Sequence, residues 1–131
     1  MPVFLLGKAM SDQQIEKEIQ AKGLTAPRVT PQLIEEAIAS EHYFTAGDGV
    51  HGACLAAGSE RSCYPSSLDL LTFCVLTLEN GFTVTGESAC ASPENFDAEI
   101  GRKIARENAV NKVWMLEGYL LKQRLHEAKS A

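Results

Sequence analysis

The sequence predicts an α+β fold in which a small antiparallel sheet, built around a β-hairpin, packs on a long C-terminal helix and a shorter N-terminal helix. Residues 71–78 and 82–85 are rich in strand formers, and they flank Asn80-Gly81, a dipeptide typical of a two-residue type I′ turn. Residues 93–121 then carry apolar side chains at helical spacing. A hairpin followed by one long helix is the basis of this fold class.

Length and composition indicate one globular domain over residues 1–131, with an N-terminal helix and connector at 1–29 and a core at 30–131. Hydrophobic residues make up 45% of the chain and charged residues 22%, which is ordinary for a globular protein. The net charge of −5 counts against binding to duplex nucleic acid. No apolar run approaches the ~18 residues that a membrane span needs, so we expect no membrane partner.

The first helix is expected over residues 11–22, with Ser11 or Asp12 as its N-cap and Gly23 as its terminator. Its apolar content is thin, because only Ile15 and Ile19 recur one turn apart. Residues 1–10 are apolar but short, and they lack the basic start of a signal peptide, so we expect none.

A second helix is expected from Pro31 to about Tyr43, with Thr30 as its N-cap. Four apolar residues share one face of that helix: Leu33, Ile34, Ala37 and Ile38. Residues 45–67 are rich in Gly, Ser and Ala, and they predict an irregular loop of a length that is usually functional or disordered.

The hairpin register follows from the turn. If Glu79 pairs with Phe82, then Thr77 faces Val84, and Val84 shares a face with Phe73 and Val75. Both faces of residues 71–78 are apolar, which predicts a central strand covered on each side by a helix or by another subunit.

The long helix is expected to start at Ser92-Pro93, with Ser92 as its cap and Pro93 at its first position. It has enough residues to exceed thirty, which is more than one small domain covers. We therefore expect part of it to pack against a second copy of the chain.

Four cysteines occur without any C-x-x-C spacing, and we expect them to be reduced thiols: Cys54, Cys63, Cys74 and Cys90. A zinc site made of Cys54, Cys63, His42 and His51 matches no standard ligand spacing, so we expect no metal and no cofactor. Known catalytic motifs are also absent from the sequence, and we expect no enzymatic activity.

The polar face of the long helix is the first candidate binding site. Arg102 and Arg106 stand one turn apart, and Asn108, Asn111 and Lys112 follow. Arginine offers paired donors to a phosphate and stacks on bases, which favours an anion site. A solvated face with ion pairs between successive turns explains the same residues.

Two further candidates lie before that face. Asn95 and the backbone amides after Ser92 would form an anion site at a helix N-terminus, unless Glu94 and Asp97 already fill that role. Phe82 follows the turn and is either ordinary core or an aromatic platform for an adenine ring.

Four strings of the sequence carry a family resemblance: VTPQLIEEAIASEHYFTA, LTFCVLTLENGFTVTGESAC, SPENFDAEIGRKIARENAVNKVW and LEGYLL. They resemble the shared core of a small family of proteins from lytic phages and prophages, long without a known function. This family includes the first-described Thoeris anti-defence protein.

The resemblance implies a sponge, which binds the cyclic ADP-ribose variant made by bacterial TIR enzymes in the host cytoplasm and holds it intact. It also implies a homo-oligomer, from dimer to hexamer. In this sequence it suggests Phe82 for stacking, Asn95 for the polar edge of the ligand, Arg102 with Arg106 for the pyrophosphate, and Arg28 from a neighbouring subunit.

Two other functions stay open. A protein-interaction module would inhibit or redirect a host protein through an apolar helix face or an acidic surface. An enzyme acting on a nucleotide would need an acid/base pair, for which the sequence shows no candidate.

Overall fold

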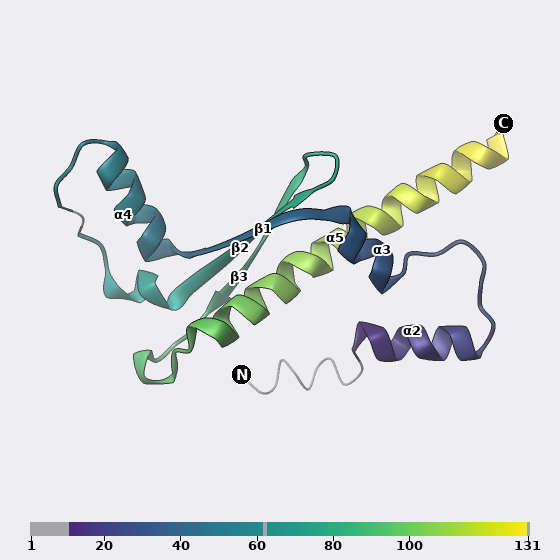
Figure 1. Ribbon diagram of the computed structural model, residues 1–131, viewed down its shortest axis with the longest axis horizontal. Helices are drawn as coiled ribbons and strands as arrows, with labels where there is room; N and C mark the ends of the chain where they lie inside the picture. Colours follow the sequence, from purple (N-terminus) through teal and green to yellow (C-terminus); the bar gives the residue numbers. More distant parts are fainter. Residues whose placement is uncertain (1–10, 62, 131) are drawn as a thin grey trace.

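The computed structural model of the protein describes residues 11–61 and 63–130. Residues 1–10, where we expect no signal peptide, lie outside the described residues. Figure 1 shows these elements in chain order: α2 (Asp12–Ala21), α3 (Pro31–Ala37), β1 (Ile38–Thr45), α4 (Ala46–Ala56), η1 (Ser66–Leu70), β2 (Leu71–Leu78), β3 (Thr83–Ala89), η2 (Pro93–Asn95) and α5 (Ala98–Ser130).

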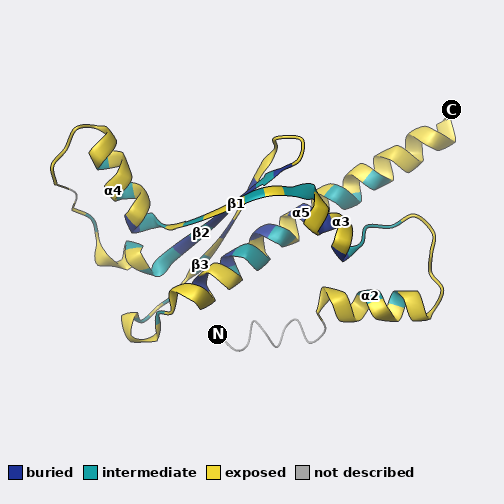
Figure 2. Cartoon of the chain, in the orientation of Figure 1, coloured by how far each residue is buried: buried dark blue, intermediate teal, exposed yellow. Residues whose placement is uncertain are grey.

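The three strands form an antiparallel sheet in the order β1-β2-β3, and α5 packs across one face of it. The predicted α+β class and the central position of residues 71–78 are therefore confirmed. The core lies between β2, β3, α3 and α5 (Figure 2), and its buried members are Ile34, Cys74, Leu76, Leu78, Val84, Ala105, Ala109 and Val113.

The sheet and α5 lie very close together at Gly86. A Cβ atom at this position would lie 2.2 Å from the carbonyl oxygen of Ala105 and 2.3 Å from the backbone nitrogen of Ala109. Because neither backbone atom can move away cheaply, glycine allows the helix to lie directly on β3.

The prediction of a helix to about Tyr43 is wrong beyond Ala37. Residues 38–45 form β1, which pairs with β2 over its length, for example Phe44 with Phe73. The apolar spacing from Leu33 to Ile38 fits a helix, but pairing with the central strand outweighs that local preference.

The hairpin register is shifted by one residue from the prediction. The amide of Leu78 donates to the carbonyl of Phe82 at 2.8 Å, so the loop has three residues, and Gly81 takes a φ of 88°. Such a loop places a glycine in the left-handed region after a tight turn. Thr77 therefore pairs with Thr83, and Val84 lies on the buried face rather than beside Phe73.

The irregular loop expected at 45–67 is wrong for residues 46–56, which form α4. Thr45 and Asp48 make a reciprocal capping box, in which each side chain accepts a hydrogen bond from the other residue's backbone amide at 3.0 Å. Helix α4 and helix α2 lie at opposite ends of the molecule (Figure 1).

The long helix begins later than predicted. Residues 93–95 form the separate turn η2, and α5 starts at Ala98, where the Asp97 carboxylate accepts a hydrogen bond from the amide of Ile100 at 3.0 Å. Its 33 residues confirm the expected length. The last turns of α5 extend past the sheet (Figure 1), and Met115 and Tyr119 are 76% and 74% exposed.

Helix α2 starts at the Ser11 N-cap and ends before Gly23, as the sequence predicts. It buries none of its residues. Within the described residues, hydrogen bonds from Arg28 and from Trp114 attach it to the rest of the fold.

Candidate functional site

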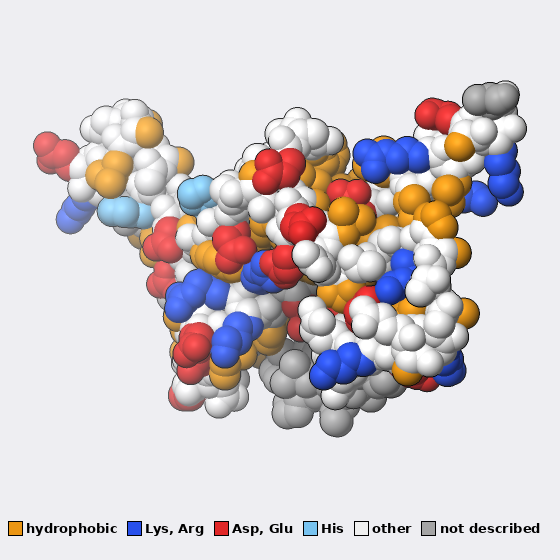
Figure 3. All heavy atoms as spheres, turned by 45° about the vertical axis from the view of Figure 1, so that its right-hand side comes forward, with side chains coloured by type: hydrophobic (Ala, Val, Ile, Leu, Met, Phe, Trp, Pro, Cys, Tyr) orange, Lys and Arg blue, Asp and Glu red, His pale blue; other side chains and the backbone are white. Residues whose placement is uncertain are grey.

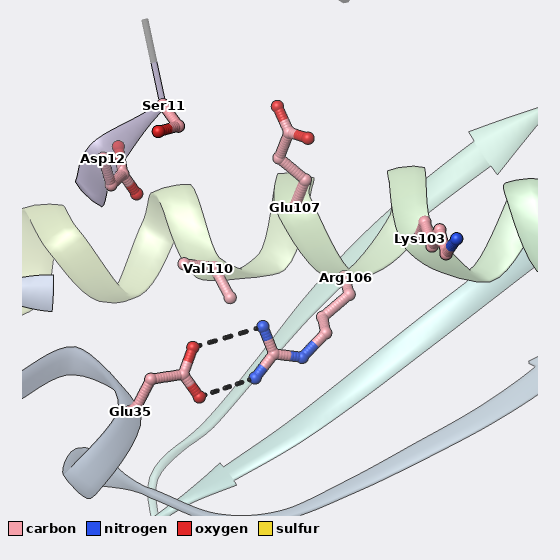
Figure 4. Close-up of a pocket in the computed structure, with 7 residues that line it drawn as sticks. All are labelled: Ser11, Asp12, Glu35, Lys103, Arg106, Glu107 and Val110. Atoms are coloured by element: carbon pink, nitrogen blue, oxygen red, sulfur yellow. Dashed lines mark hydrogen bonds and ion pairs between the residues drawn. The ribbon is translucent and has the colours of Figure 1, made fainter. Parts of the chain in front are cut away.

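Arg106 joins three elements on the side of the molecule that carries α2. Its guanidinium donates to both carboxylate oxygens of Glu35 on α3, at 2.9 and 3.4 Å, and its Nε donates to Glu41 on β1 at 3.1 Å. In Figure 4, Arg106 and Glu35 point toward one another from α5 and α3. The cation is therefore shared by two carboxylates, and an incoming anion has to compete with them.

The titration of this cluster follows from these contacts. Partial burial acts to lower the pKa of Arg106, but the Glu35 and Glu41 carboxylates outweigh it and raise that pKa. Partial burial likewise acts to raise the pKa of Glu41, while hydrogen bonds from Tyr43 and Arg106 lower it overall. The raised pKa of Arg106 and the lowered pKa of Glu41 keep both of these groups charged near neutral pH.

A hollow of about 450 Å³ opens beside Arg106, a volume within the range of ligand pockets. It is lined by Ser11, Asp12, Glu35, Lys103, Arg106, Glu107 and Val110. Two cations therefore face three carboxylates, and Figure 3 shows acidic and basic side chains intermingled on this side of the molecule. The hollow offers phosphate donors within a surface of mixed charge.

A second hollow, of about 280 Å³, adjoins the first at Asp12 and follows α2. Its lining is mainly apolar and comprises Asp12, Ile15, Glu16, Ile19, Val29, Pro31, Asn111 and Trp114. The indole Nε1 of Trp114 donates to the Asp12 carboxylate at 3.1 Å, between the two spaces.

Arg28 lies at the second hollow, where it pairs with Glu16. Its Nη2 donates to one oxygen of Glu16 at 2.7 Å, and its Nη1 donates to the other. The hydrogen bonds from Arg28 lower the pKa of Glu16 from 4.5 to about 2 and raise that of Arg28. Like Arg106, this predicted ligand residue is held by a carboxylate of its own chain.

Arg102 lies elsewhere, at a hollow of about 110 Å³ beside Phe44 and Phe96. It makes no hydrogen bond or ion pair within residues 11–61 and 63–130. Although it stands one turn from Arg106, the two guanidinium groups serve different hollows. This space is too small for a nucleotide by the usual size of ligand pockets.

Phe82 and Asn95 lie at opposite ends of the sheet. Phe82 is 56% exposed in the hairpin turn, beside Leu78. Asn95 is exposed in η2, just before the start of α5, where Asp97 takes the capping role. One chain therefore brings Arg28 and Arg106 to the same side and leaves Phe82, Asn95 and Arg102 apart from them.

The sequence did not point to Glu35, Glu41, Asp12 or Trp114 as site residues. Glu35 and Glu41 meet Arg106 because α3 ends at Ala37 and β1 follows, a boundary with no clear local signal. By contrast, Asn108 has a structural reason for its place in the helix, since its amide donates to the carbonyl of Glu87 at 2.8 Å.

All four cysteines are free thiols. Among the described residues, no three His, Cys, Asp or Glu side chains are grouped so that they could hold a metal ion. Within the same residues, no helix is long and apolar enough to cross a membrane.

Fold and site together define an α+β protein with a ligand-sized hollow beside its long helix. Residues 29–125 match the phage protein (N4 Gp49/phage Sf6 gene 66) family, and the chain belongs to that family. No curated protein and no solved structure matches the chain. The family segment runs from the connector to near the end of α5 and does not include α2.

Proposed function

We propose that this protein is a phage or prophage anti-defence protein, which binds a cyclic ADP-ribose variant in the cytoplasm of the bacterial host and holds it without cleaving it. The observation that carries the proposal is the 450 Å³ hollow in which Arg106 and Lys103 lie on one face of α5. Its volume suits a nucleotide, and its cations suit a pyrophosphate. Membership in the phage family and the resemblance of its core strings support the same function.

Capture in this proposal is an exchange of partners at Arg106. The guanidinium releases Glu35, which is the more exposed of its two carboxylates, and takes a phosphate oxygen pair in the same geometry. Glu41 keeps its contact with Nε, so the side chain stays oriented while the ligand binds.

Isothermal titration with cyclic ADP-ribose variants tests the proposal, followed by mass spectrometry of the recovered ligand. Saturable binding with intact ligand supports it, whereas turnover of the ligand contradicts it. Arg106→Ala is expected to weaken binding by about 10- to 100-fold, because a charge-assisted contact contributes roughly 1.5–3 kcal/mol.

Lys112→Ala is the matched control, since it also removes one cation from α5 but lines neither hollow beside α2. An equal loss of ligand affinity in the two variants would mean that the overall positive charge of α5, and not a contact with Arg106, accounts for that loss. An unchanged affinity in Arg106→Ala would remove this residue from the site.

We further propose that the protein is a homo-oligomer, in which the exposed apolar residues of α5 contact a second copy. These include Met115, Leu116, Tyr119, Leu120 and Leu125. The same exposed apolar residues of α5 are also consistent with the alternative function, a module that binds a host protein. Pull-down of a stable host partner without bound nucleotide would favour this alternative.

A further inference from the structure

In the described part of the chain, residues 11–61 and 63–130, the inner side of α2 lines the second hollow. Ile15 is 43% exposed, and it lines the 280 Å³ hollow together with Ile19, Val29, Pro31 and Trp114. Apolar side chains of this kind normally bury their surface against one another. Here they surround a volume that is open to a ring-shaped apolar group.

The rim of this hollow is rich in hydrogen-bond acceptors. Asp12 accepts the indole N–H of Trp114, and Glu16 accepts both hydrogen bonds from Arg28. A carboxylate has room for about four hydrogen bonds, so Asp12 retains acceptor capacity for a ligand. Glu16 also accepts a hydrogen bond from Gln20 at 2.6 Å, which leaves it room for about one more. An amino group on the ligand would find partners here, whereas a keto oxygen would meet negative charge.

We propose that this second hollow holds the base of the captured nucleotide, with an amino-bearing purine stacked on Trp114. This inference rests on the proposed function, because the phosphates are placed at Arg106 and Lys103 in the adjoining hollow. Asp12 lines both spaces, so a ligand that spans them passes this residue. The base then contacts α2, which lies outside the family segment of residues 29–125.

Trp114 is a better platform than Phe82 within one chain. Phe82 lies in the hairpin turn. Trp114 lines the hollow that adjoins the one beside Arg106, and Asp12 lines both. Indole also has the larger ring face for stacking on a base.

The chain contains one tryptophan, so its fluorescence reports on this hollow directly. We expect cyclic ADP-ribose variants to change the emission of Trp114 with the same midpoint as the calorimetric titration. Calorimetric binding without any change in emission would overturn the base placement and leave the proposed function intact. Absence of calorimetric binding to every variant would instead contradict the proposed function.

Trp114→Ala is expected to weaken binding by about 5- to 100-fold, the range for loss of one base–aromatic stack. Tyr119→Ala is the matched control, because it removes an aromatic ring from the same helix at a position that is 74% exposed. An equal effect of both substitutions, or none from Trp114→Ala, would contradict the proposal.

Trp114 also packs against the core, so a second variant avoids any loss of folding. Asp12→Asn keeps an acceptor for the indole N–H and removes the charge at the rim. We expect it to reduce the preference for cyclic ADP-ribose over its inosine analogue, which carries a keto oxygen in place of the amino group. Equal binding of the two ligands by the wild-type protein would overturn the assignment. A change in Trp114 emission that depends on protein concentration and not on ligand would also overturn it, because it would mean that a second copy of the chain occupies the hollow.

Discussion

The contact of α5 with the sheet and the contact of α5 with α2 differ in kind. At the sheet, Gly86 lets backbone meet backbone at Ala105 and Ala109, and the surrounding side chains are fully buried. At α2, a hydrogen bond from Trp114 and an ion pair between Arg28 and Glu16 hold a helix that has no fully buried residue. The close packing of α5 on the sheet stabilises the fold. The polar attachment of α2 leaves a ligand-sized space beside α5, and α2 can detach at a low cost in free energy.

Two isoleucines on successive helices give the largest expected contrast between these regions. Ile34 on α3 is 1% exposed and Ile15 on α2 is 43% exposed. We expect Ile34→Ala to lower the free energy of unfolding by about 2–5 kcal/mol, since it leaves a cavity in the core. The same change at Ile15 is expected to cost less than about 1 kcal/mol. Urea denaturation measures both, and equal costs would show that α2 is packed as firmly as α3.

Glycine substitutions sharpen the comparison within the contact of α5 and the sheet. Gly86→Ala is expected to cost about 1–3 kcal/mol, because its Cβ would overlap backbone atoms of α5. Gly118→Ala lies on α5 with no atom within 4 Å of the added Cβ, and we expect it to stabilise the protein by up to about 1 kcal/mol. Opposite shifts in thermal midpoint are the expected result, and a neutral Gly86→Ala would mean that helix and sheet separate easily.

Acid is expected to release α2 before it unfolds the core. The folded-state pKa of Glu16 is about 2, below its ordinary 4.5, so its pairing with Arg28 is fully present above pH 4.5. The contribution is lost as the pH falls from 4.5 toward 2. We expect the emission of Trp114 to change over this window while far-ultraviolet circular dichroism retains most of its signal.

Two variants on α2 test that assignment. Glu16→Gln is expected to remove the change in emission between pH 4.5 and 2, whereas Glu18→Gln, whose partner is Lys22 at 3.3 Å, is expected to keep it. An identical acid response in the wild type and in Glu16→Gln would assign the change to another carboxylate.

The elements with strong local signals were predicted from the sequence. Helix α2 has the Ser11 cap, β2 is apolar on both faces, and α5 has a long apolar stripe. β1 was missed because residues 38–43 fit a helix locally, and pairing with β2 decides its conformation. Helix α4 was missed because its glycines disfavour a helix, although Thr45 and Asp48 carry a capping-box signal.

The candidate site was less predictable than the fold. Arg106 could be chosen by residue type, and Arg28 was suggested by the family resemblance as a residue of a neighbouring subunit. Arg106 lines the first hollow beside α2, and Arg28 pairs with Glu16 at the second. Their carboxylate partners could not be chosen, because Glu35 and Glu41 meet Arg106 only through the tertiary arrangement of α3, β1 and α5. A local sequence pattern has no information about contacts across 65 or 71 residues.

The order of the strands has a consequence for how the chain folds. β2 and β3 are adjacent in sequence and can pair within microseconds, while β1 must close a loop that contains α4 and η1 before it pairs with β2. The ion pairs of Arg106 depend on that closure, so they form late. During synthesis from the N-terminus, the backbone hydrogen-bonding groups of β1 stay unpaired until β2 has been made, that is, until the residues from Ala46 to Leu78 have been added.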